Sequence, residues 1–287
     1  MKVKAYAKVN LMLDILKKLD NGYHSLFMLM QSVDLYDIVS VEKNNKNKIY
    51  VKSNKDIVSD QKENIAYKSA EAFFEYTDIK DKGIDIYIEK NIPMAAGLAG
   101  GSADGAAVIY ILNKIFNVNL SLKEMQSISN KVGADIPFSL QGGTAIALNT
   151  GDILADVNAL PKSYFVLVKP DMDISTPEAY AMMDNLDRIR HLNRIEILSA
   201  LSDCDYSKIV SLCANVFEQG VEVPERPYIK SIMRKSKADA CLMTGSGPTV
   251  FGIFSDLSKA EICYEKLKGK YINTFLCKST DKGIEEI

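Results

Sequence analysis

The segment 91–107, NIPMAAGLAGGSADGAA, constrains the fold most, because three glycines and several alanines stand directly before a helix-like run. Glycine loses more backbone entropy on folding than other residues, so such a cluster indicates that something approaches the backbone closely. The N–H groups at a helix N-terminus attract anions. The segment therefore predicts a phosphate-binding loop, in which side chains at Gly97, Gly100 and Gly101 would block the phosphate oxygens, followed by a helix over 102–116 with Ser102 as its N-cap.

Common phosphate-loop and hydrolase signatures are absent from this segment. It contains neither G-x-x-x-x-G-K-[ST] nor a G-x-G-x-x-G after a strand. Ser102 is not in a G-x-S-x-G turn, because Asp104 takes the fifth position, and the chain has only two histidines, His24 and His191. A loop that merely permits tight helix packing remains the alternative.

A second glycine loop, MTGSGPTVFGIF at 243–254, lies far away in the sequence. Each loop adjoins a hydrophobic strand, so the two together favour a phosphate pocket between two domains. A tight turn in which Pro248 starts an edge strand is the alternative for the second loop.

The alternation of secondary-structure patterns predicts an α+β fold of two domains, because strands and helices are mixed without a regular βαβα repeat. Turn residues at 150–162 place the boundary near residue 155, which gives domains 1–155 and 156–287. Strands are predicted at 2–16, 38–42, 49–51, 84–90, 142–148, 163–170, 240–243, 249–254 and 273–278. Helices are predicted at 63–76, 102–116, 121–133, 176–184, 193–202, 208–219 and 228–235.

Composition excludes several classes of protein. A net charge of −2 gives no sign of the basic surface that nucleic-acid binding needs. No apolar run approaches the roughly 20 residues that span a bilayer, and the N-terminus lacks the apolar core of a signal peptide. Five cysteines without a C-x-x-C pair favour buried, reduced thiols over disulfides or a zinc site. We expect a cytoplasmic protein, a monomer or weak homodimer, with a small-molecule substrate and no nucleic-acid or membrane partner.

Three segments, AYAKVNLMLDI, PMAAGLAGGSADGAA and LMTGSGPTVFG, occur in the order seen in the GHMP kinases, and the chain resembles that family. The motifs AKVNLML, DNGYHSL, GADIPF and ISTPEAY resemble most closely the members that phosphorylate a cytidine diphosphate-linked methylerythritol in the non-mevalonate isoprenoid pathway. The resemblance spans most of the chain and thins between residues 184 and 237.

The resemblance implies an N-terminal domain like ribosomal protein S5, a ferredoxin-like C-terminal domain and an active site between them. It implies ATP as phosphoryl donor, Mg²⁺, and the tertiary 2-hydroxyl as acceptor. Ala103 stands where a second serine is common, and Gly105 replaces a helix-favouring residue at about 1 kcal/mol relative to alanine. A homoserine or mevalonate kinase, or a non-catalytic ligand sensor on the same fold, remains as an alternative. The motif NGYH argues against the other kinases, and retention of Lys8 and Asp135 argues against the sensor.

The resemblance also assigns the chemistry. Asp135 in GADIPF matches the catalytic aspartate, and Lys8 matches the lysine beside it. Without the resemblance, Lys8 reads as a solvent-facing strand residue and Asp135 as a turn residue before Pro137. Asn10 lies two residues after Lys8, so both side chains are expected on one face of a strand, in the wall of the cleft.

The ATP site is predicted around the glycine loop. Asn64 and Lys90 match positions near the adenine, although a surface salt bridge is the alternative for Lys90. No cluster of protein ligands for a metal is evident, so Mg²⁺ is expected on the phosphates with Ser102 and water. The loop residues expected to hold the phosphates are Pro93, Met94, Ala95, Ala96, Gly97, Leu98, Ala99, Gly100, Gly101, Ser102 and Ala103.

The acceptor site is predicted from aromatic residues. By resemblance, Tyr23 and Tyr180 sandwich the cytosine while His24 pairs with its polar edge. Thr176 lies four residues before Tyr180, so the two share a helix face if TPEAY is helical. Ordinary core aromatics and a histidine in a capped turn are the alternative.

Overall fold

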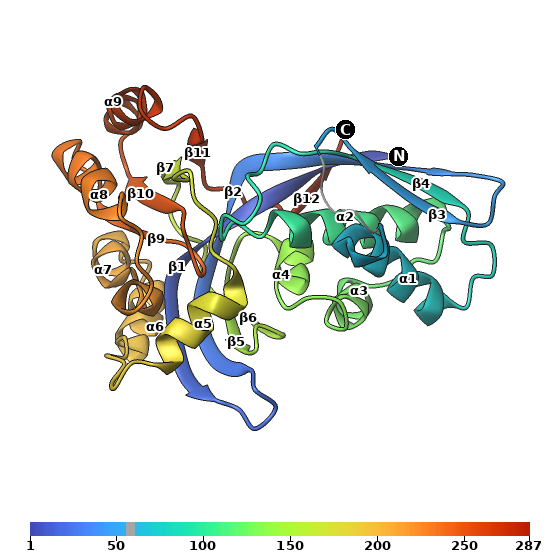
Figure 1. Ribbon diagram of the computed structural model, residues 1–287, viewed down its shortest axis with the longest axis horizontal. Helices are drawn as coiled ribbons and strands as arrows, with labels where there is room; N and C mark the ends of the chain where they lie inside the picture. The colour runs from blue at the N-terminus through green and yellow to red at the C-terminus, as the bar shows by residue number, and fades with distance from the viewer. Residues whose placement is uncertain (56–60) are drawn as a thin grey trace.

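Two long antiparallel strands, β1 (Lys2–Lys18) and β2 (His24–Lys43), pass through both halves of the molecule (Figure 1). The computed structural model describes residues 1–55 and 61–287. Most of β1 is buried, because α2 (Gly100–Ile115) and α4 (Ile136–Gln141) pack on it and β8 (Ala214–Asn215) and η2 (Val216–Gln219) of the second half adjoin it. This burial explains why the charged and amide side chains on β1 must find partners inside the protein.

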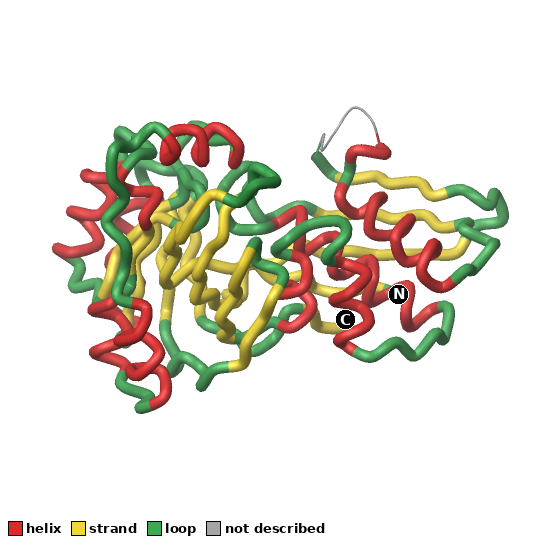
Figure 2. Tube along the Cα trace, turned by 90° about the horizontal axis from the view of Figure 1, so that it is seen from below, coloured by secondary structure: helices red, strands yellow, loops and turns green. Residues whose placement is uncertain are grey.

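The N-terminal sheet surrounds these two strands, in the order β12–β1–β2–β4–β3. The first part of β2 pairs with β5, which pairs with β6, and β8 runs parallel beside β1. The strands are β3 (Ile49–Ser53), β4 (Ile84–Glu89), β5 (Thr144–Asn149), β6 (Ile153–Asp156), β8 (Ala214–Asn215) and β12 (Ile284–Glu286). Because β12 pairs with β1, the two chain ends lie close together (Figures 1 and 2).

Helices cover one face of this sheet (Figure 1). They are η1 (Gln61–Glu63), α1 (Ile65–Thr77), α2 (Gly100–Ile115), α3 (Leu122–Ser129) and α4 (Ile136–Gln141). A capping box formed by Ser121 and Glu124 begins α3, within the helix predicted at 121–133. Gly105 has a packing reason: a Cβ there would lie 2.6 Å from the Ser69 hydroxyl of α1, so the glycine lets α1 and α2 approach.

The C-terminal half has its own four-stranded antiparallel sheet, in the order β11–β7–β10–β9. Its strands are β7 (Tyr164–Val168), β9 (Ala240–Met243), β10 (Val250–Phe254) and β11 (Thr274–Lys278), with α8 (Arg226–Lys235) and α9 (Leu257–Lys268) packed on them. The β-α-β-β-α-β order confirms the predicted ferredoxin-like topology. Four further elements precede α8: α5 (Thr176–Asp184), α6 (Arg194–Ser202), α7 (Tyr206–Leu212) and η2 (Val216–Gln219). Figure 2 shows helices at the outer end of this half, with strands between them and the N-terminal half.

Several predicted bounds are wrong. Helix α2 begins at Gly100 after Ala99, whose φ of 58° turns the chain, and no side chain caps it, so Ser102 is not the N-cap. The helix predicted over 208–219 ends at Leu212, because Asn215 pairs in β8 and its side chain bonds Met243 and Gly245. Strand β2 begins before residue 38, and α9 was not predicted. Cys204 is exposed rather than buried.

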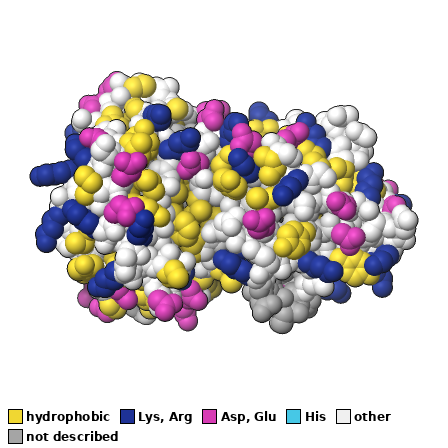
Figure 3. All heavy atoms as spheres, turned by 90° about the horizontal axis from the view of Figure 1, so that it is seen from above, with side chains coloured by type: hydrophobic (Ala, Val, Ile, Leu, Met, Phe, Trp, Pro, Cys, Tyr) yellow, Lys and Arg dark blue, Asp and Glu magenta, His cyan; other side chains and the backbone are white. Residues whose placement is uncertain are grey.

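The domain boundary at residue 155 stays a prediction. Strands of the second half also pair in the first sheet. The first sheet ends in sequence at β6 and the second begins at β7, but β8 and β12 of the second half both pair with β1. Among residues 1–55 and 61–287, no helix has the length and apolar character to cross a membrane. On the face in Figure 3, basic and acidic side chains are interspersed rather than gathered in one basic band.

The two glycine loops meet at the junction of the halves. Gly97 has a φ of 70°, and a Cβ at this position would lie only 2.3 Å from the backbone oxygen of Thr244. Gly245 has a φ of 56°, and a Cβ added at this position would lie 3.0 Å from the Cα of Gly97. The sequence pattern therefore serves a backbone-to-backbone contact between the two halves.

We predict that Gly97→Ala lowers the melting temperature more than Gly22→Ala does. Both glycines have positive φ, but a Cβ at Gly22 meets nothing within 4 Å, so the control carries the backbone strain without the collision. Overpacking costs typically about 1–3 kcal/mol. Thermal melts of both variants would measure the difference, and equal melting temperatures would show that the loops do not touch as described.

Candidate active site

A cavity of about 650 Å³ lies between the two halves. The N-terminal half contributes Lys8, Asp135 and the loop 93–102 to its wall. The C-terminal half contributes Thr176, Tyr180, Phe217, Gly245 and Ser246. The volume is in the range of small-molecule sites, and the position between two domains is a common one for them.

Lys8 and Asp135 form an ion pair in this cavity. Lys8 is on β1 and only 4% exposed, so the alternative of a solvent-facing strand residue is wrong. Its Nζ lies 3.4 Å from Asp135 Oδ2 and donates a hydrogen bond of 2.8 Å to Asn10 Oδ1. Asp135 stands directly before α4 and uses no side-chain oxygen to cap that helix, so its partly exposed carboxylate is available to a ligand.

Asn10 lies behind Lys8 and is completely buried, so the expectation that it forms the wall of the cleft is wrong. Its Oδ1 accepts hydrogen bonds from Lys8 Nζ at 2.8 Å and from the Gly245 N–H at 3.1 Å. The backbone N–H of Asn10 donates to Thr244 Oγ1 at 3.0 Å. The side chains of Lys8 and Asn10 are on one face of β1, as predicted. Asn10 does not face the cavity, however; it orients Lys8 and the second glycine loop.

The first glycine loop has a backbone suited to an anion. Ala95, Gly97 and Ala99 have φ angles of 48°, 70° and 58°, while the residues between them do not have positive φ. Alternation of right- and left-handed backbone turns successive N–H groups toward one side and forms an anion-binding concavity. The first turn of α2 adds N–H groups without helical partners.

Gly100 and Gly101 also have a packing cause within the protein. A Cβ at Gly100 would lie 2.9 Å from the Ile92 side chain and 3.3 Å from Lys90 Nζ. A Cβ at Gly101 would lie 3.1 Å from Ile65. Side chains at these positions would therefore meet protein atoms. The loop needs glycine in order to fit against β4 and α1.

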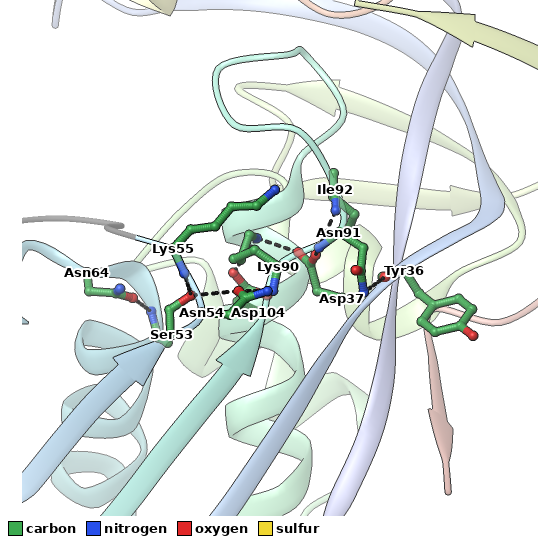
Figure 4. Close-up of polar contacts among 11 residues, drawn as sticks. Tyr36, Asp37, Ser53, Asn54, Lys55, Asn64, Lys90, Asn91, Ile92 and Asp104 are labelled. Carbon is green, nitrogen blue, oxygen red and sulfur yellow. Dashed lines mark hydrogen bonds and ion pairs between the residues drawn. The ribbon is translucent and has the colours of Figure 1, made fainter. Parts of the chain in front are cut away.

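Lys90 lies beneath the loop in a buried cluster with two carboxylates (Figure 4). Its Nζ pairs with Asp37 Oδ2 and lies 2.7 Å from Asp104 Oδ2. Asp37 Oδ1 accepts hydrogen bonds from the N–H groups of Asn91 at 2.6 Å and Ile92 at 2.8 Å. The alternative of a surface salt bridge is wrong. The cluster fastens both ends of the loop, at the exit of β4 and one turn into α2.

Burial raises the pKa of Asp104 to about 8. The ammonium of Lys90 lowers this pKa, but the second carboxylate, Asp37, raises it again. Burial also lowers the pKa of Lys90, and the attraction of the two carboxylates outweighs burial, so its pKa is raised overall. Two acids share one cation in a dry environment, so one carboxylate retains a proton near neutral pH. Asp104 Oδ1 has no hydrogen-bond partner among the described residues.

Asn64 has a structural task at the border of the cavity. Its Oδ1 accepts a hydrogen bond of 2.8 Å from the N–H of Ala66 and caps the start of α1. The residue still lines the cavity, next to Lys90. It fixes the end of α1 that faces the glycine loop.

The aromatic end of the cavity differs from the predicted arrangement. The His24 ring stacks on Tyr180, with centroids 4.5 Å apart, and its Nε2 lies 2.8 Å from Asp184 Oδ1. Tyr23 is 66% exposed and lines the cavity, whereas His24 does not line it. A base between the two tyrosines with His24 at its edge is therefore not the arrangement present, because His24 covers one face of Tyr180.

Hydrogen bonds from Lys18 and from His24 lower the pKa of Asp184. The carboxylate is therefore ionised and holds the histidine ring. Burial raises the pKa of Tyr180, and the negative charge of Asp135 adds to this, so the phenol stays protonated. Phe217 meets the Tyr180 ring edge-on at 5.0 Å and closes this end of the cavity.

Helix α5 confirms the prediction that TPEAY is helical. A capping box of Ser175 and Glu178 starts the helix, and Thr176 and Tyr180 both line the cavity from its first turns. Thr176 Oγ1 lies 3.4 Å from Ser246 Oγ of the second glycine loop. The cavity wall is therefore continuous from α5 to that loop.

The described residues contain no group of three or more metal-ligating side chains. Ser102 and Asp135 bring oxygen atoms to the cavity wall next to the phosphate loop. Oxygen is the ligand type that Mg²⁺ prefers, and this ion commonly uses one or two protein ligands together with phosphates and water. These residues fit a magnesium ion that arrives with a nucleotide.

Sequence reasoning missed Asp37, Asp104, Asp184, Phe217 and Ser246. Ser246 lies in the second glycine loop, and the glycines of that loop mark its place in the sequence. The other four are brought to the site by contacts distant in sequence; Asp37 and Lys90, for example, are 53 residues apart. No local pattern marks such residues.

Two family descriptions match separate parts of the chain. "GHMP kinases N terminal domain" matches residues 64–143, and "GHMP kinases C terminal" matches residues 182–273. The fold and the cavity between the matched domains thus define the class as a GHMP kinase, for which ATP is the co-substrate.

Curated relatives extend over nearly the whole chain. A 4-diphosphocytidyl-2-C-methyl-D-erythritol kinase of Clostridium perfringens (strain 13 / Type A) is 43% identical over 275 residues, 94% of each chain. One of Thermoanaerobacter pseudethanolicus is 41% identical over 289 residues, 99% of this chain and 98% of the relative. The chain belongs to the 4-diphosphocytidyl-2-C-methyl-D-erythritol kinase family.

Solved structures agree with this fold. The crystal structure of a 4-(cytidine 5'-diphospho)-2C-methyl-D-erythritol kinase is 28% identical with a TM-score of 0.81, and the match covers 97% of this chain and 99% of that one. A homoserine kinase from Cytophaga hutchinsonii has a TM-score of 0.79 at 19% identity, covering 100% of this chain and 97% of that one. The second likeness shows the shared fold alone.

We predict that Asp104→Asn stabilises the protein increasingly as pH rises. The pKa of Asp104 is about 8 in the folded protein, above the usual 3.8, so between these values the native state binds more protons than the unfolded state. Stability therefore falls as pH rises through this window, and asparagine removes that loss. Thermal melts from about pH 5 to about pH 8.5 should show a growing difference in favour of the variant.

The exposed Asp187→Asn is the matched control and should show no such trend. A difference between wild type and Asp104→Asn that is constant or shrinks with pH would contradict a protonated carboxyl in the cluster.

Proposed function

We propose that this protein transfers the γ-phosphoryl group of ATP to the 2-hydroxyl of 4-diphosphocytidyl-2-C-methyl-D-erythritol. The observation that carries the proposal is the Lys8–Asp135 pair, 3.4 Å apart, in a cavity with the glycine loop on one side and aromatic rings on the other. The curated relatives bear this name, and they match the chain over nearly its full length.

Asp135 acts as the general base in this proposal. Its Oδ2 accepts the proton of the acceptor hydroxyl while the oxygen attacks the γ-phosphorus. Lys8, held by Asn10, places its ammonium beside the same oxygen and stabilises the negative charge that develops there. Burial of Lys8 strengthens this effect, because water screens it little.

The glycine loop holds the phosphates of ATP with backbone N–H groups of residues 95–102. Ser102, the hydroxyl residue of the loop, would help to hold a Mg²⁺ ion, which would neutralise phosphate charge when bound with the nucleotide. Lys90 and Asn64 also line the cavity, and in this proposal the remainder of the nucleotide lies toward them. We infer a cytoplasmic location from the ATP chemistry, and expect no nucleic-acid partner.

The cytidine part of the acceptor occupies the aromatic end in this proposal. Tyr23, Tyr180 and Phe217 offer ring surfaces there. Stacking of a base on an aromatic side chain contributes about 1–3 kcal/mol but accepts any base, so edge contacts must discriminate. The His24 ring stacks on Tyr180, with its Nε2 2.8 Å from Asp184 Oδ1, so in this proposal the ring must leave Tyr180 in order to supply that edge contact.

We predict that Asp135→Asn lowers kcat by about 10²–10⁴-fold and leaves the Kd for ATP near that of wild type. The base is lost, whereas the phosphates are held by backbone groups of another segment. Steady-state kinetics and calorimetric titration with ATP would measure both. Asp171→Asn, at an exposed position, serves as control. A variant that keeps more than about a tenth of the rate would remove Asp135 from its assigned role.

We also predict that the acceptor must carry cytosine. ADP release should be fastest with the cytidine diphosphate-linked methylerythritol, and slower with the uridine counterpart, free methylerythritol 4-phosphate, homoserine or mevalonate. A site that satisfies buried polar groups rejects analogues that leave them unpaired. His24→Ala should reduce the preference for cytidine over uridine.

Equal rates with the cytidine and uridine acceptors in wild type would contradict the proposed cytidine site. Turnover of homoserine or mevalonate alone would point to another kinase of the class. No turnover of any of these acceptors, with ATP still bound, would favour the ligand sensor.

A further inference from the structure

A second cavity, of about 590 Å³, lies in the C-terminal half and shares no lining residue with the first. The segment between α5 and α6 forms one side through Arg188 and Arg190. Helix α8 contributes Lys230, and β8 and η2 contribute Asn215 and Glu218. Its volume lies within the range of small-molecule sites.

The cavity has a surplus of positive charge. Three cations, Arg188, Arg190 and Lys230, and one carboxylate, Glu218, line it. Glu218 is already engaged, because its Oε2 pairs with Lys230 and its Oε1 accepts the N–H of Met243 at 2.6 Å. Neither arginine takes part in an ion pair with any of the described residues. Two unpaired guanidinium groups thus line one small hollow.

The backbone that carries these arginines is held in place. The N–H of Arg190 donates to Gln219 Oε1 at 2.9 Å, and Gln219 Nε2 donates back to the Arg190 carbonyl at 2.8 Å. Gln219 belongs to η2 and also lines the cavity. A backbone that is already fixed lowers the entropy that this segment loses when it binds a ligand.

The thiols of the cavity argue against a reactive site. Burial raises the pKa of the Cys213 thiol to about 12 and also raises the pKa of the Cys241 thiol. Both therefore remain protonated and are poor nucleophiles and metal ligands at neutral pH. The arginines are the groups available to a ligand.

We propose that this cavity is a second, non-catalytic site for a small molecule that carries phosphate groups, with Arg188 and Arg190 on its phosphate oxygens. The planar guanidinium forms two parallel hydrogen bonds to phosphate, and two such groups match a diphosphate. The hollow is larger than one phosphate requires, so its apolar side, with Leu186 and Leu242, contacts the rest of the molecule.

Asn215, which lines this cavity, is hydrogen-bonded to a residue that lines the first cavity. Asn215 Nδ2 donates to the carbonyls of Met243 and Gly245, each at 2.8 Å. Gly245 in turn donates its N–H to Asn10 Oδ1, which holds Lys8. Three hydrogen bonds therefore connect Asn215, in the wall of the second cavity, to Lys8. The binding itself does not depend on the proposed reaction.

Calorimetric titration with inorganic diphosphate would test the site, at fixed ionic strength and with a saturating non-hydrolysable ATP analogue in the catalytic cavity. Wild type should bind one diphosphate per chain under these conditions. Arg188→Ala/Arg190→Ala should weaken binding at least about tenfold, since hydrogen bonds to charged groups contribute about 1.5–3 kcal/mol. Lys123→Ala/Lys131→Ala, which removes two exposed cations from the other half, should bind like wild type.

If the alanine variant fails to fold, Arg188→Lys/Arg190→Lys keeps the charge and loses the planar fork, and it should also bind more weakly than wild type. Absence of binding to wild type at millimolar diphosphate would overturn the proposal. Equal weakening in the arginine and lysine-to-alanine variants would overturn it as well, because it would reduce the effect to net charge.

Discussion

The buried amide of Asn10 is the interaction on which the site depends. Its Oδ1 accepts hydrogen bonds from Lys8 Nζ on the same strand and from the N–H of Gly245 in the other half, and the backbone N–H of Asn10 donates to Thr244 Oγ1. A buried polar group that loses its hydrogen-bond partner destabilises the folded protein by about 1–3 kcal/mol. Loss of the Asn10 side chain would therefore leave its partners without a hydrogen bond in the interior. One side chain thereby sets the position of the lysine and joins the two halves. The Lys8–Asp135 pair, 3.4 Å apart, follows from that anchorage.

A second buried group gives the phosphate loop its rigidity. Asp37 binds the chain where the loop begins, and through Lys90 it reaches Asp104 where α2 has begun. A cluster with two acids and one base is costly to bury unless a proton is retained, which explains the raised pKa of Asp104. Together with the left-handed turns of the loop, the cluster fixes N–H groups before a ligand arrives. A preorganised site of this kind loses little free energy to reorganisation when charge develops.

Periodicity was enough to find most of the elements, because local patterns determine them. The alternation at 84–90 and the helical pattern over 176–184 both correspond to observed structure. Tertiary contacts decided the rest. Asn215 bonds the Met243–Gly245 turn and pairs in β8 where the local pattern favours helix, and the start of α2 depends on the left-handed turn at Ala99.

Site residues divide in the same way. Lys8 and Asp135 came from resemblance, and the structure brings them together; the cluster beneath the loop and the partner of His24 left no pattern in the sequence. The most direct test of the account is a double-mutant cycle on kcat with Asn10→Ala and Lys8→Met. If Asn10 acts by positioning Lys8, the double variant should be no slower than Lys8→Met alone. Losses that multiply would show that Asn10 acts independently of the lysine and would contradict the account.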